Sequence, residues 1–324
     1  MDREAVIIAT SQPSLQGVIT YMEKKKEILL EVGTNELEIM EFLVDGRSFG
    51  INVAKVLEIM KYEEVTPVAQ ASPFVEGIFK PRNQIITVFD LAKYLGLNPT
   101  VDNERDILII TNFNQNHTAF HVHSVEIIHR ISWQDIEKPD ETITSGKDGV
   151  TTGIARVAGR LITILDFERI MAEINPSHSF SADTLMVGED ESRREKSIVV
   201  VEDSPFLKKV VLECLHKSGY TNTLSFSTGE EAWEALESLG NEDIETLGQH
   251  VACVITDIEM PRMDGHALTK RIKSHRNLRH LPVIIFSSLI SPEMKIKGES
   301  VGADAQVSKP QINELVGHVD RLSI

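Results

Sequence analysis

Hydrophobic and polar residues follow different patterns in the two halves of the chain. From Leu37 to about Ile174, short β-prone runs alternate with turn residues, which predicts many short strands. The predicted strands cover residues 38–44, 48–52, 84–89, 106–111, 118–122 and 161–165. The pair Asp45-Gly46 is a two-residue hairpin signal, and residues 53–60 are expected to form a short amphipathic helix. Strands this short and numerous favour small β-barrels.

Residues 197 to 324 follow the second pattern, in which apolar runs alternate with amphipathic segments. The runs 198–201, 251–256, 282–286 and 305–308 are bounded by polar residues, as is typical of strands buried on both faces of a parallel sheet. The buried faces expected for the helices are Leu207, Val211, Cys214 and Leu215 in one and Ile312, Leu315, Val316 and Val319 in the last. This alternation predicts a doubly wound α/β sheet with helices on both sides.

Two segments of different composition flank the β-rich half. Residues 1–36 carry apolar side chains at helical spacing and are predicted to form a helical leader. Residues 175–196 are polar, serine-rich and acidic, and are predicted to be a linker. The expected organisation is a leader (1–36), a β domain (37–174), a linker (175–196) and an α/β domain (197–324).

The β-rich half contains an internal echo. The stretch from Gly77 to Leu91 recurs from Gly153 to Phe167 as a glycine, a short strand, a tight turn, an apolar strand and an aspartate. Such an echo predicts two similar subdomains. Asp90 and Asp166 stand where a helix begins, and we expect each to be an N-cap.

Polar groups with reactive chemistry stand at the ends of the apolar runs in the second half. Glu202 and Asp203 follow the first run, Asp257 the second, Ser287 the third and Lys309 the fourth. Open α/β sheets place their sites at the carboxyl ends of strands. Three carboxylates would form a hard oxygen site for Mg²⁺, and a carboxylate can accept a phosphoryl group. A lysine and a hydroxyl would neutralise charge on the transferring oxygens.

This ordered set resembles the receiver domain of two-component response regulators, whose fold is flavodoxin-like, over about Ser197 to Leu322. The resemblance implies that Asp257 is the phospho-acceptor. It implies that Asp203 and Asp257 bind the metal directly, Glu202 through water and Glu259 by its backbone carbonyl. It also implies that Ser287 and Lys309 sense the phosphoryl group. Two features depart from the family: Gln306 stands where an aromatic residue is common, and the loop at 238–250 is long.

The first half resembles the CheW-like coupling domain of bacterial chemotaxis. The resembling stretches are 41–44, 50–59, 77–83 and 153–167. The family implies two interlocked five-stranded barrels, a double SH3-like fold, which bind chemoreceptor tips and the regulatory domain of a histidine kinase. Arg82, in Lys-Pro-Arg-Asn, aligns with the arginine of the family's Asn-Leu-Arg-Gly turn, and is either a partner contact or only a turn residue.

Composition and charge argue against several classes of partner and site. The net charge of −16 is spread over both halves and argues against a nucleic-acid or anionic-membrane surface. No signal peptide or apolar span is evident, so a cytoplasmic protein without direct membrane insertion is expected, with Cys214 and Cys253 as buried thiols. His121 and His123 alternate on a predicted strand, but spacing supplies no third ligand, so a solvated strand face is expected instead of a metal site.

Together, the two resemblances are those of a CheV-type chemotaxis adaptor, which is not an enzyme. Such a protein couples chemoreceptors to a histidine kinase, in association with the membrane receptor arrays, and Mg²⁺-dependent phosphorylation of its receiver gives adaptation or a phosphate sink. The alternative is a pure scaffold whose receiver is only a docking module. An enzyme is not favoured, because neither a Gly-x-Ser-x-Gly elbow nor a nucleotide-binding glycine loop is present.

Overall fold

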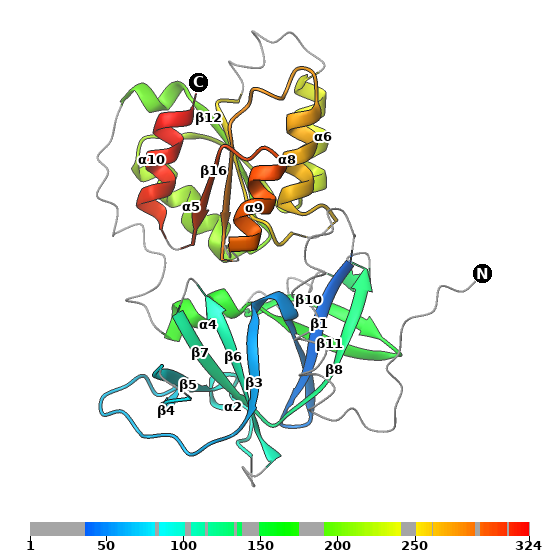
Figure 1. Ribbon diagram of the computed structural model, residues 1–324, viewed down its shortest axis with the longest axis vertical. Coiled ribbons are helices and arrows are strands. Elements are labelled where there is room, and N and C mark those ends of the chain that lie inside the picture. Colours follow the sequence, from blue (N-terminus) through cyan, green and yellow to red (C-terminus); the bar gives the residue numbers. More distant parts are fainter. Residues whose placement is uncertain are drawn as a thin grey trace, which may run out of the picture. The chain divides into compact units, whose positions relative to one another are not determined.

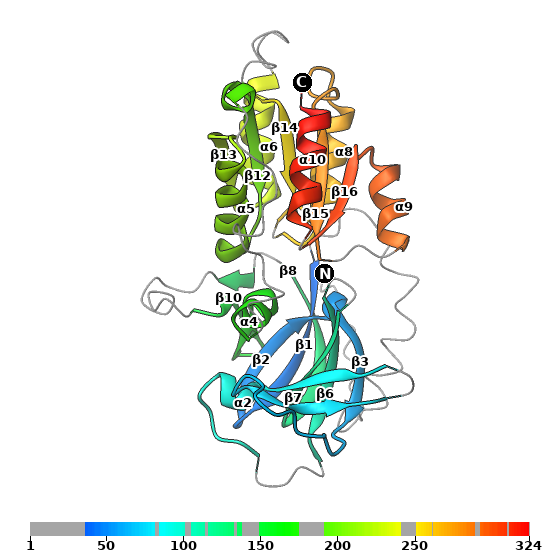
Figure 2. The same cartoon turned by 90° about the vertical axis from the view of Figure 1, so that its left-hand side faces the viewer.

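The computed structural model of the chain describes residues 36–81, 84–100, 105–113, 116–132, 135–137, 149–174, 191–240, 251–260, 262–288, 292–309 and 311–323. They fall into two compact units, one within residues 36–174 and the other within residues 191–323 (Figures 1 and 2). The predicted leader, apart from its last residue, and the linker as far as residue 190 lie outside the described residues.

The first unit is mostly β and contains a six-stranded and a five-stranded sheet, ordered β8-β1-β2-β11-β10-β9 and β3-β6-β7-β5-β4. The strands are β1 (Glu36–Val44), β2 (Arg47–Asn52), β3 (Val56–Lys61), β4 (Val75–Phe79), β5 (Ile86–Asp90), β6 (Ile107–Phe113), β7 (Asn116–Val122), β8 (Ser124–Ser132), β9 (Ile136–Glu137), β10 (Thr151–Val157) and β11 (Arg160–Leu165). The first sheet exceeds the expected five strands because the two-residue β9 pairs with β10.

Two similar subdomains are present, as the echo predicts. In each sheet a hairpin, β4–β5 or β10–β11, joins the other strands through a parallel pair, β5 with β7 or β11 with β2. Each hairpin has a register shift just before its glycine, Gly77 or Gly153. A Cβ at Gly77 would lie 2.5 Å from the carbonyl oxygen of Thr66, so that side-chain-free position lets neighbouring backbone approach.

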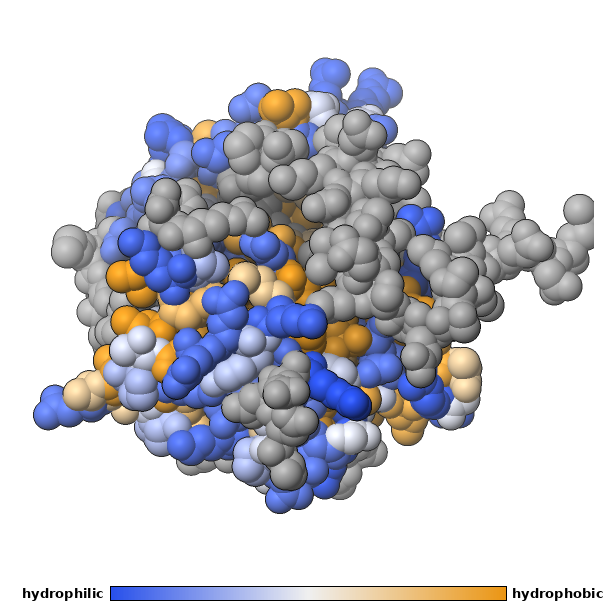
Figure 3. Space-filling view, turned by 60° about the horizontal axis from the view of Figure 1, so that its bottom comes forward, coloured by the Kyte–Doolittle hydropathy of each residue, from blue (hydrophilic) through white to orange (hydrophobic). Residues whose placement is uncertain are grey.

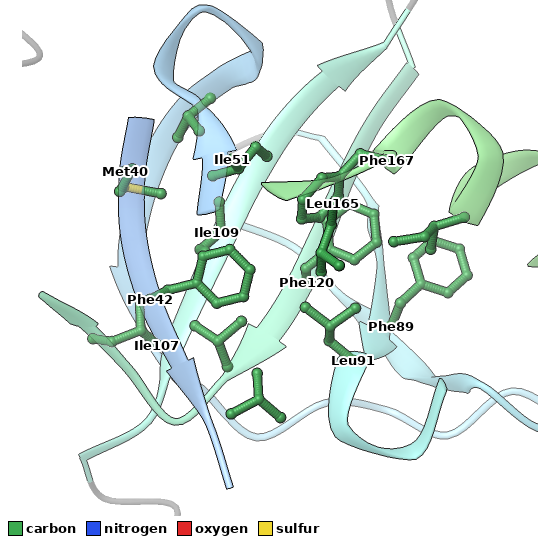
Figure 4. Close-up of a cluster of buried hydrophobic side chains, with 14 of the residues drawn as sticks. Met40, Phe42, Ile51, Phe89, Leu91, Ile107, Ile109, Phe120, Leu165 and Phe167 are labelled. Atoms are coloured by element: carbon green, nitrogen blue, oxygen red, sulfur yellow. The ribbon is translucent and has the colours of Figure 1, made fainter. Parts of the chain in front are cut away.

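Aromatic and aliphatic side chains together fill the core to which both sheets contribute (Figure 4). The rings of Phe120 and Phe167 meet edge to face with centroids 4.8 Å apart, and Phe42 contacts Phe167 at 6.3 Å. All three side chains are fully buried. Burial of one such ring stabilises the fold by about 1.5–3 kcal/mol, so this cluster holds the subdomains together.

Both predicted aspartate N-caps are confirmed. Asp90 precedes α2 (Leu91–Tyr94) and its Oδ1 accepts a hydrogen bond from the backbone N–H of Lys93. Asp166 precedes α4 (Phe167–Ile174) and accepts from the N–H of Arg169. Each carboxylate satisfies a backbone donor that the first helical turn leaves without a partner.

The prediction of a helix at residues 53–60 is wrong. Only Val53–Lys55 form a 3₁₀ turn, capped by Asn52, and the chain then continues as β3. β3 pairs with β6 with a register shift between Val56 and Glu58, so the apolar residues lack the strict alternation of a strand. β8 was also not predicted, because its burial pattern is nearly uniform and gives no two-residue period.

His121 lies in a buried network and not on a solvated face, so that expectation is wrong for it. Its Nδ1 lies 2.9 Å from Oε2 of Glu76, and its Nε2 lies 2.7 Å from Oδ2 of Asp106. The Tyr62 ring stacks on the imidazole, and its hydroxyl donates to Glu76. His123 instead accepts a hydrogen bond at Nδ1 from the backbone N–H of Asp45, so the two histidines serve different contacts.

This network predicts that the first unit loses stability as the pH rises above about 6.5. Burial opposes the imidazolium, but the hydrogen bonds and charges of Glu76 and Asp106 outweigh it and raise the pKa of His121. A group whose pKa is raised by folding contributes its full stabilisation below its unfolded-state pKa. This stabilisation is lost as the pH rises through the folded-state pKa.

Calorimetry of the full-length chain from mildly acidic to mildly alkaline pH would test this. His121→Gln should show a flatter pH dependence, and His117→Gln, on the same strand, should behave as the unsubstituted chain. Equal pH dependence of the His121 variant and the unsubstituted chain would contradict the prediction.

The second unit is a five-stranded parallel sheet with strand order β13-β12-β14-β15-β16. Its strands are β12 (Ser197–Val201), β13 (Asn222–Phe226), β14 (Cys253–Thr256), β15 (Val283–Ser287) and β16 (Ala305–Ser308); its helices are α5 (Pro205–Lys217), α6 (Gly229–Gly240), α8 (Gly265–Ser274), α9 (Pro292–Ser300) and α10 (Ile312–Leu322). Buried side chains of α5 and α10 cover one face and those of α6 and α8 the other (Figure 1). The predicted doubly wound sheet is confirmed.

Some large apolar side chains are exposed at the surface of the described residues. On the face shown in Figure 3, hydrophobic residues are interspersed with hydrophilic ones. Large exposed apolar side chains include Leu57, Ile85 and Leu161 in the first unit and Ile296 in the second. Within the described ranges, none of the helices has the length and apolar character needed to span a bilayer.

Candidate functional site

The candidate site lies at the carboxyl ends of the central strands of the second unit. Val201 of β12 pairs with Thr256 of β14, so Glu202 and Asp257 leave the sheet side by side. Ser287 of β15 pairs with Ser308 of β16, so Lys309 leaves the sheet beside them. The strand register therefore brings together residues that are up to 107 positions apart in the chain.

Three carboxylates converge there. One oxygen from each of Glu202, Asp203 and Asp257 lies within 4.8 Å of the other two. Glu202 and Asp257 are buried and Asp203 is half-buried. Oxygen ligands this close, one of them partly open to solvent, suit Mg²⁺, which binds through few carboxylates and keeps several waters. The donor set therefore fits the implied metal.

Lys309 brings a positive charge into this cluster. Its Nζ lies 2.8 Å from Oε2 of Glu202 and 3.1 Å from Oδ2 of Asp257, and its side chain is 1% exposed. A buried ammonium needs such partners because desolvation of a lone charge costs several kcal/mol. The Lys309 ammonium thus offsets part of the repulsion between the carboxylates and places a positive charge beside Asp257.

Backbone groups fix the position of Asp257. Its N–H donates to the carbonyl of Val201 at 2.9 Å, and its Oδ1 accepts from the N–H of Ile258 at 2.6 Å. The hydroxyl of Thr256 donates to the Asp257 carbonyl at 2.9 Å. These backbone contacts fix the orientation of the Asp257 carboxylate within the cluster.

The helices that follow two of the strands begin with side-chain caps. Ser204 accepts from the N–H of Leu207, with Pro205 in the first turn of α5, as predicted. Its backbone N–H also donates to Oε1 of Glu202 at 3.3 Å. Asp264 caps α8 by accepting from the N–H of Ala267 at 2.6 Å. The role of Asp264 was not predicted, although an acid just before Gly265 and a helical segment is a capping signal.

Three more predicted site residues are Ser287, Glu259 and Arg82, and they differ in burial and placement. Ser287 is fully buried, and its carbonyl accepts from the N–H of Lys309 at 3.1 Å. Glu259 lies in the loop after Asp257 and is half-buried. Arg82, the candidate partner contact, lies outside the described residues. The structure thus brings together Glu202, Asp203, Asp257 and Lys309 by side-chain geometry, with Ser287 at the same rim by strand register.

Gln306, at the position where receivers often carry an aromatic ring, contacts α9. Its Nε2 donates to the carbonyl of Lys295 at 2.8 Å. A Cβ at Gly298 would lie 2.3 Å from Oε1 of Gln306, so the amide packs where α9 has no side chain. In this structure the side chain is therefore a contact between β16 and α9.

The acid cluster predicts that Mg²⁺ stabilises the second unit. Bound Mg²⁺ would relieve repulsion among the three carboxylates, and at 100 times its Kd a ligand adds about 2.7 kcal/mol to the free energy of unfolding. Thermal unfolding in MgCl₂ and in EDTA would measure the effect. Asp203→Asn should remove most of it, and Glu213→Gln, on an exposed part of α5, should not; equal Mg²⁺ responses of these two variants would contradict the assignment.

Comparison with known proteins gives matches to both units. The family described as "CheW-like domain" matches residues 38–175, and the family described as "Response regulator receiver domain" matches residues 198–320. The chain is 29% identical over 302 residues to "Chemotaxis protein CheV3" of Helicobacter pylori, which covers 89% of this chain and 95% of that protein. It is 28% identical over 298 residues to "Chemotaxis protein CheV2" of the same organism, covering 87% and 93%.

A solved structure is also similar to part of the chain. The scaffolding protein TtCheW from Thermoanaerobacter tengcongensis aligns with 40% of this chain and 88% of its own, at 25% identity and a TM-score of 0.37. The two domain families together span most of the chain, and the similarity to the two Helicobacter proteins extends across both units.

Proposed function

The chain is a CheV-type chemotaxis coupling protein, with a CheW-like domain followed by a response regulator receiver domain, and on this premise we propose that phosphorylation of Asp257 regulates its coupling activity. The phosphoryl group would come from a phosphohistidine of a chemotaxis histidine kinase. The chain itself is an adaptor, and its receiver assists only the transfer to its own aspartate.

The observation that supports this proposal is the Lys309 ammonium seated between Glu202 and Asp257 in an oxygen-rich cluster. In the proposed transfer, a carboxylate oxygen of Asp257 forms a bond to phosphorus while the bond from phosphorus to the donor imidazole nitrogen breaks, and that nitrogen leaves on the kinase. Bound Mg²⁺, held by Glu202, Asp203, Asp257 and the backbone of Glu259, would neutralise charge on the phosphoryl oxygens.

Lys309 and Ser287 would supply the remaining contacts. The Lys309 ammonium lies 3.1 Å from the accepting carboxylate and can pair with a phosphoryl oxygen after little movement. Ser287 ends β15 at the same rim, where its hydroxyl would bond another phosphoryl oxygen. Both contacts exist only with the phosphoryl group present, so phosphorylation would favour a second arrangement of the rim.

The CheW-like domain would carry the coupling function. We propose that it binds chemoreceptor cytoplasmic tips and the kinase, that Arg82 belongs to that contact surface, and that the protein associates with receptor arrays in the cytoplasm through these partners. A phosphorylated receiver would then change this coupling, which yields adaptation or a phosphate sink.

A sedimentation assay with receptor and kinase fragments tests the proposal. The full-length chain, with and without Mg²⁺ and the phosphoryl mimic beryllofluoride, should bind with different affinities, and Asp257→Ala should show one affinity in both conditions. If the unsubstituted chain binds equally with and without the mimic, the receiver is a docking module and the proposed regulation fails.

A further inference from the structure

Arg193 anchors the segment that leads into the receiver domain. Residues Glu191–Glu195 form a 3₁₀ turn just before β12, within the stretch that the sequence assigns to the linker. Although Arg194 and Glu195 beside it are exposed, Arg193 is buried. An arginine is seldom buried unless it is paired, so its partners show what this segment is attached to.

Those partners come from the end of α10 and the end of α5. Nε and Nη2 of Arg193 donate to the two carboxylate oxygens of Asp320 at 2.7 and 2.8 Å. Nη1 donates to the carbonyl of Ser218 at 2.7 Å. The guanidinium also lies 5.6 Å from the ring centroid of Tyr220, whose hydroxyl donates to Asp320 at 2.7 Å.

The Arg193 guanidinium and the Asp320 carboxylate form a bidentate ion pair, and a third side chain holds the carboxylate. Two parallel N–H···O bonds fix the guanidinium in the plane of the carboxylate, a geometry that only arginine offers. The Tyr220 hydroxyl holds the carboxylate from another side. Lys196 adds a second tie to the same place, because its Nζ donates to the carbonyl and the hydroxyl of Ser323 at 3.0 and 2.9 Å.

α10 connects this anchor to the phosphorylation site. It begins at Ile312, three residues after Lys309, and ends at Leu322, just past Asp320. Its residues Leu315 and Val319 are fully buried against the sheet, so it moves as one packed element. One end of α10 therefore follows the lysine that contacts Asp257, and the other end holds the segment that enters the domain.

We propose that the Arg193–Asp320 pair is a phosphorylation-sensitive latch through which the receiver controls the segment leading from the CheW-like domain. The inference rests on the proposed function. When Lys309 turns to the phosphoryl group, the start of α10 is displaced and its far end moves relative to Arg193. Since the pair now has short bonds at both oxygens, such movement can only lengthen them, and the latch opens.

Trypsin reports the latch directly, because it cleaves after Arg193 only when that side chain leaves its partners. Cleavage of the full-length chain between Arg193 and Arg194 is followed by mass spectrometry of the new terminus. Proteolysis of a locally closed site tracks the open population, so Asp320→Asn should speed this cleavage at least about tenfold. Arg193→Lys keeps a cleavable cation but loses the fork, and should also be cut faster.

The phosphorylated state is then compared with the unphosphorylated one, using acetyl phosphate and Mg²⁺ as phosphodonor. In the unsubstituted chain cleavage should speed up severalfold, and in Asp320→Asn it should already be fast and not respond. Glu213→Gln, which loses the exposed ion pair to Lys209, is the matched control and should respond as the unsubstituted chain. Calorimetry and retained phosphoryl incorporation show that the variants are folded.

Two failures are distinguishable. If the chain gains the phosphoryl mass but cleavage after Arg193 is unchanged, the pair is a static staple and the inference is overturned, while the proposed phosphorylation stands. If no phosphoryl mass is gained, the proposed function fails and the latch fails with it.

Discussion

Replacing Asp257 by asparagine should lower the incorporation of a phosphoryl group from acetyl phosphate by at least about 100-fold. An amide at this position is not a nucleophile toward phosphorus, whereas the carboxylate is. Because the two side chains have the same shape, the loss would reflect chemistry and not packing. Intact-mass spectrometry of the full-length chain, with Mg²⁺ present, measures the incorporation.

The same substitution should leave the fold intact, so that a loss of phosphoryl incorporation reports the loss of the accepting carboxylate. Asp257 is one of three neighbouring carboxylates, and Lys309 keeps Glu202 as a partner when the charge at 257 is removed. Without Mg²⁺ we therefore expect the thermal stability of the Asp257→Asn variant to equal or exceed that of the unsubstituted chain. A variant that still gains the phosphoryl mass would rule out Asp257 as the acceptor.

Asp264→Asn is the matched control. It makes the same chemical change seven positions later, at the N-cap of α8. Asparagine caps helices about as well as aspartate, so stability and phosphoryl incorporation should both be preserved. If this control also lost phosphoryl incorporation, the loop after Asp257 would tolerate no such change. The loss in Asp257→Asn could then not be assigned to the missing nucleophile.

The sequence predicted the parallel sheet because its strands are unbroken apolar runs. The run 305–308 is β16 as observed, and the run 198–201 differs from β12 by one residue. Once these strands are parallel, groups just past their ends must share one rim, so the site residues could be placed without coordinates. β13 gave no such signal because, at the sheet edge, it is mostly exposed.

The buried charged networks could not be predicted, because their partners meet only through the fold. Glu41 is fully buried in β1, yet His129 and Arg160, 88 and 119 positions away, hold its carboxylate. An acid within an apolar run looks like a solvent-facing strand residue in the sequence. The Arg193–Asp320 pair, 127 positions apart, was missed for the same reason, since a polar serine-rich stretch indicates a linker.

Among the described glycines of the receiver domain, Gly265 is where substitution by alanine should cost the most stability. A Cβ at Gly265 would lie 1.9 Å from the carbonyl oxygen of Asp257 and 3.2 Å from the Cα of Ile258. Both neighbours are backbone, so neither can rotate away. We expect a loss of about 3 kcal/mol or more in the free energy of unfolding, at the upper end of overpacking effects.

Gly265→Ala should also lower phosphoryl incorporation at Asp257. Relief of the overlap requires the Asp257 backbone to move, and its carboxylate is aimed by hydrogen bonds to the N–H of Ile258 and the carbonyl of Val201. Phosphoryl incorporation should therefore fall by more than the fraction of unfolded protein explains. Mass spectrometry under conditions where calorimetry shows a folded receiver separates the two effects.

Gly317→Ala makes the same change where nothing opposes it. Gly317 lies inside α10, and no neighbouring atom comes within 4 Å of the added Cβ. Alanine restricts the unfolded chain and favours the helix, so this variant should gain roughly 0.5–1 kcal/mol and keep full phosphoryl incorporation. Opposite signs for the two glycine variants would show that the backbone contact behind Asp257 is what the site depends on, and equal effects would refute it.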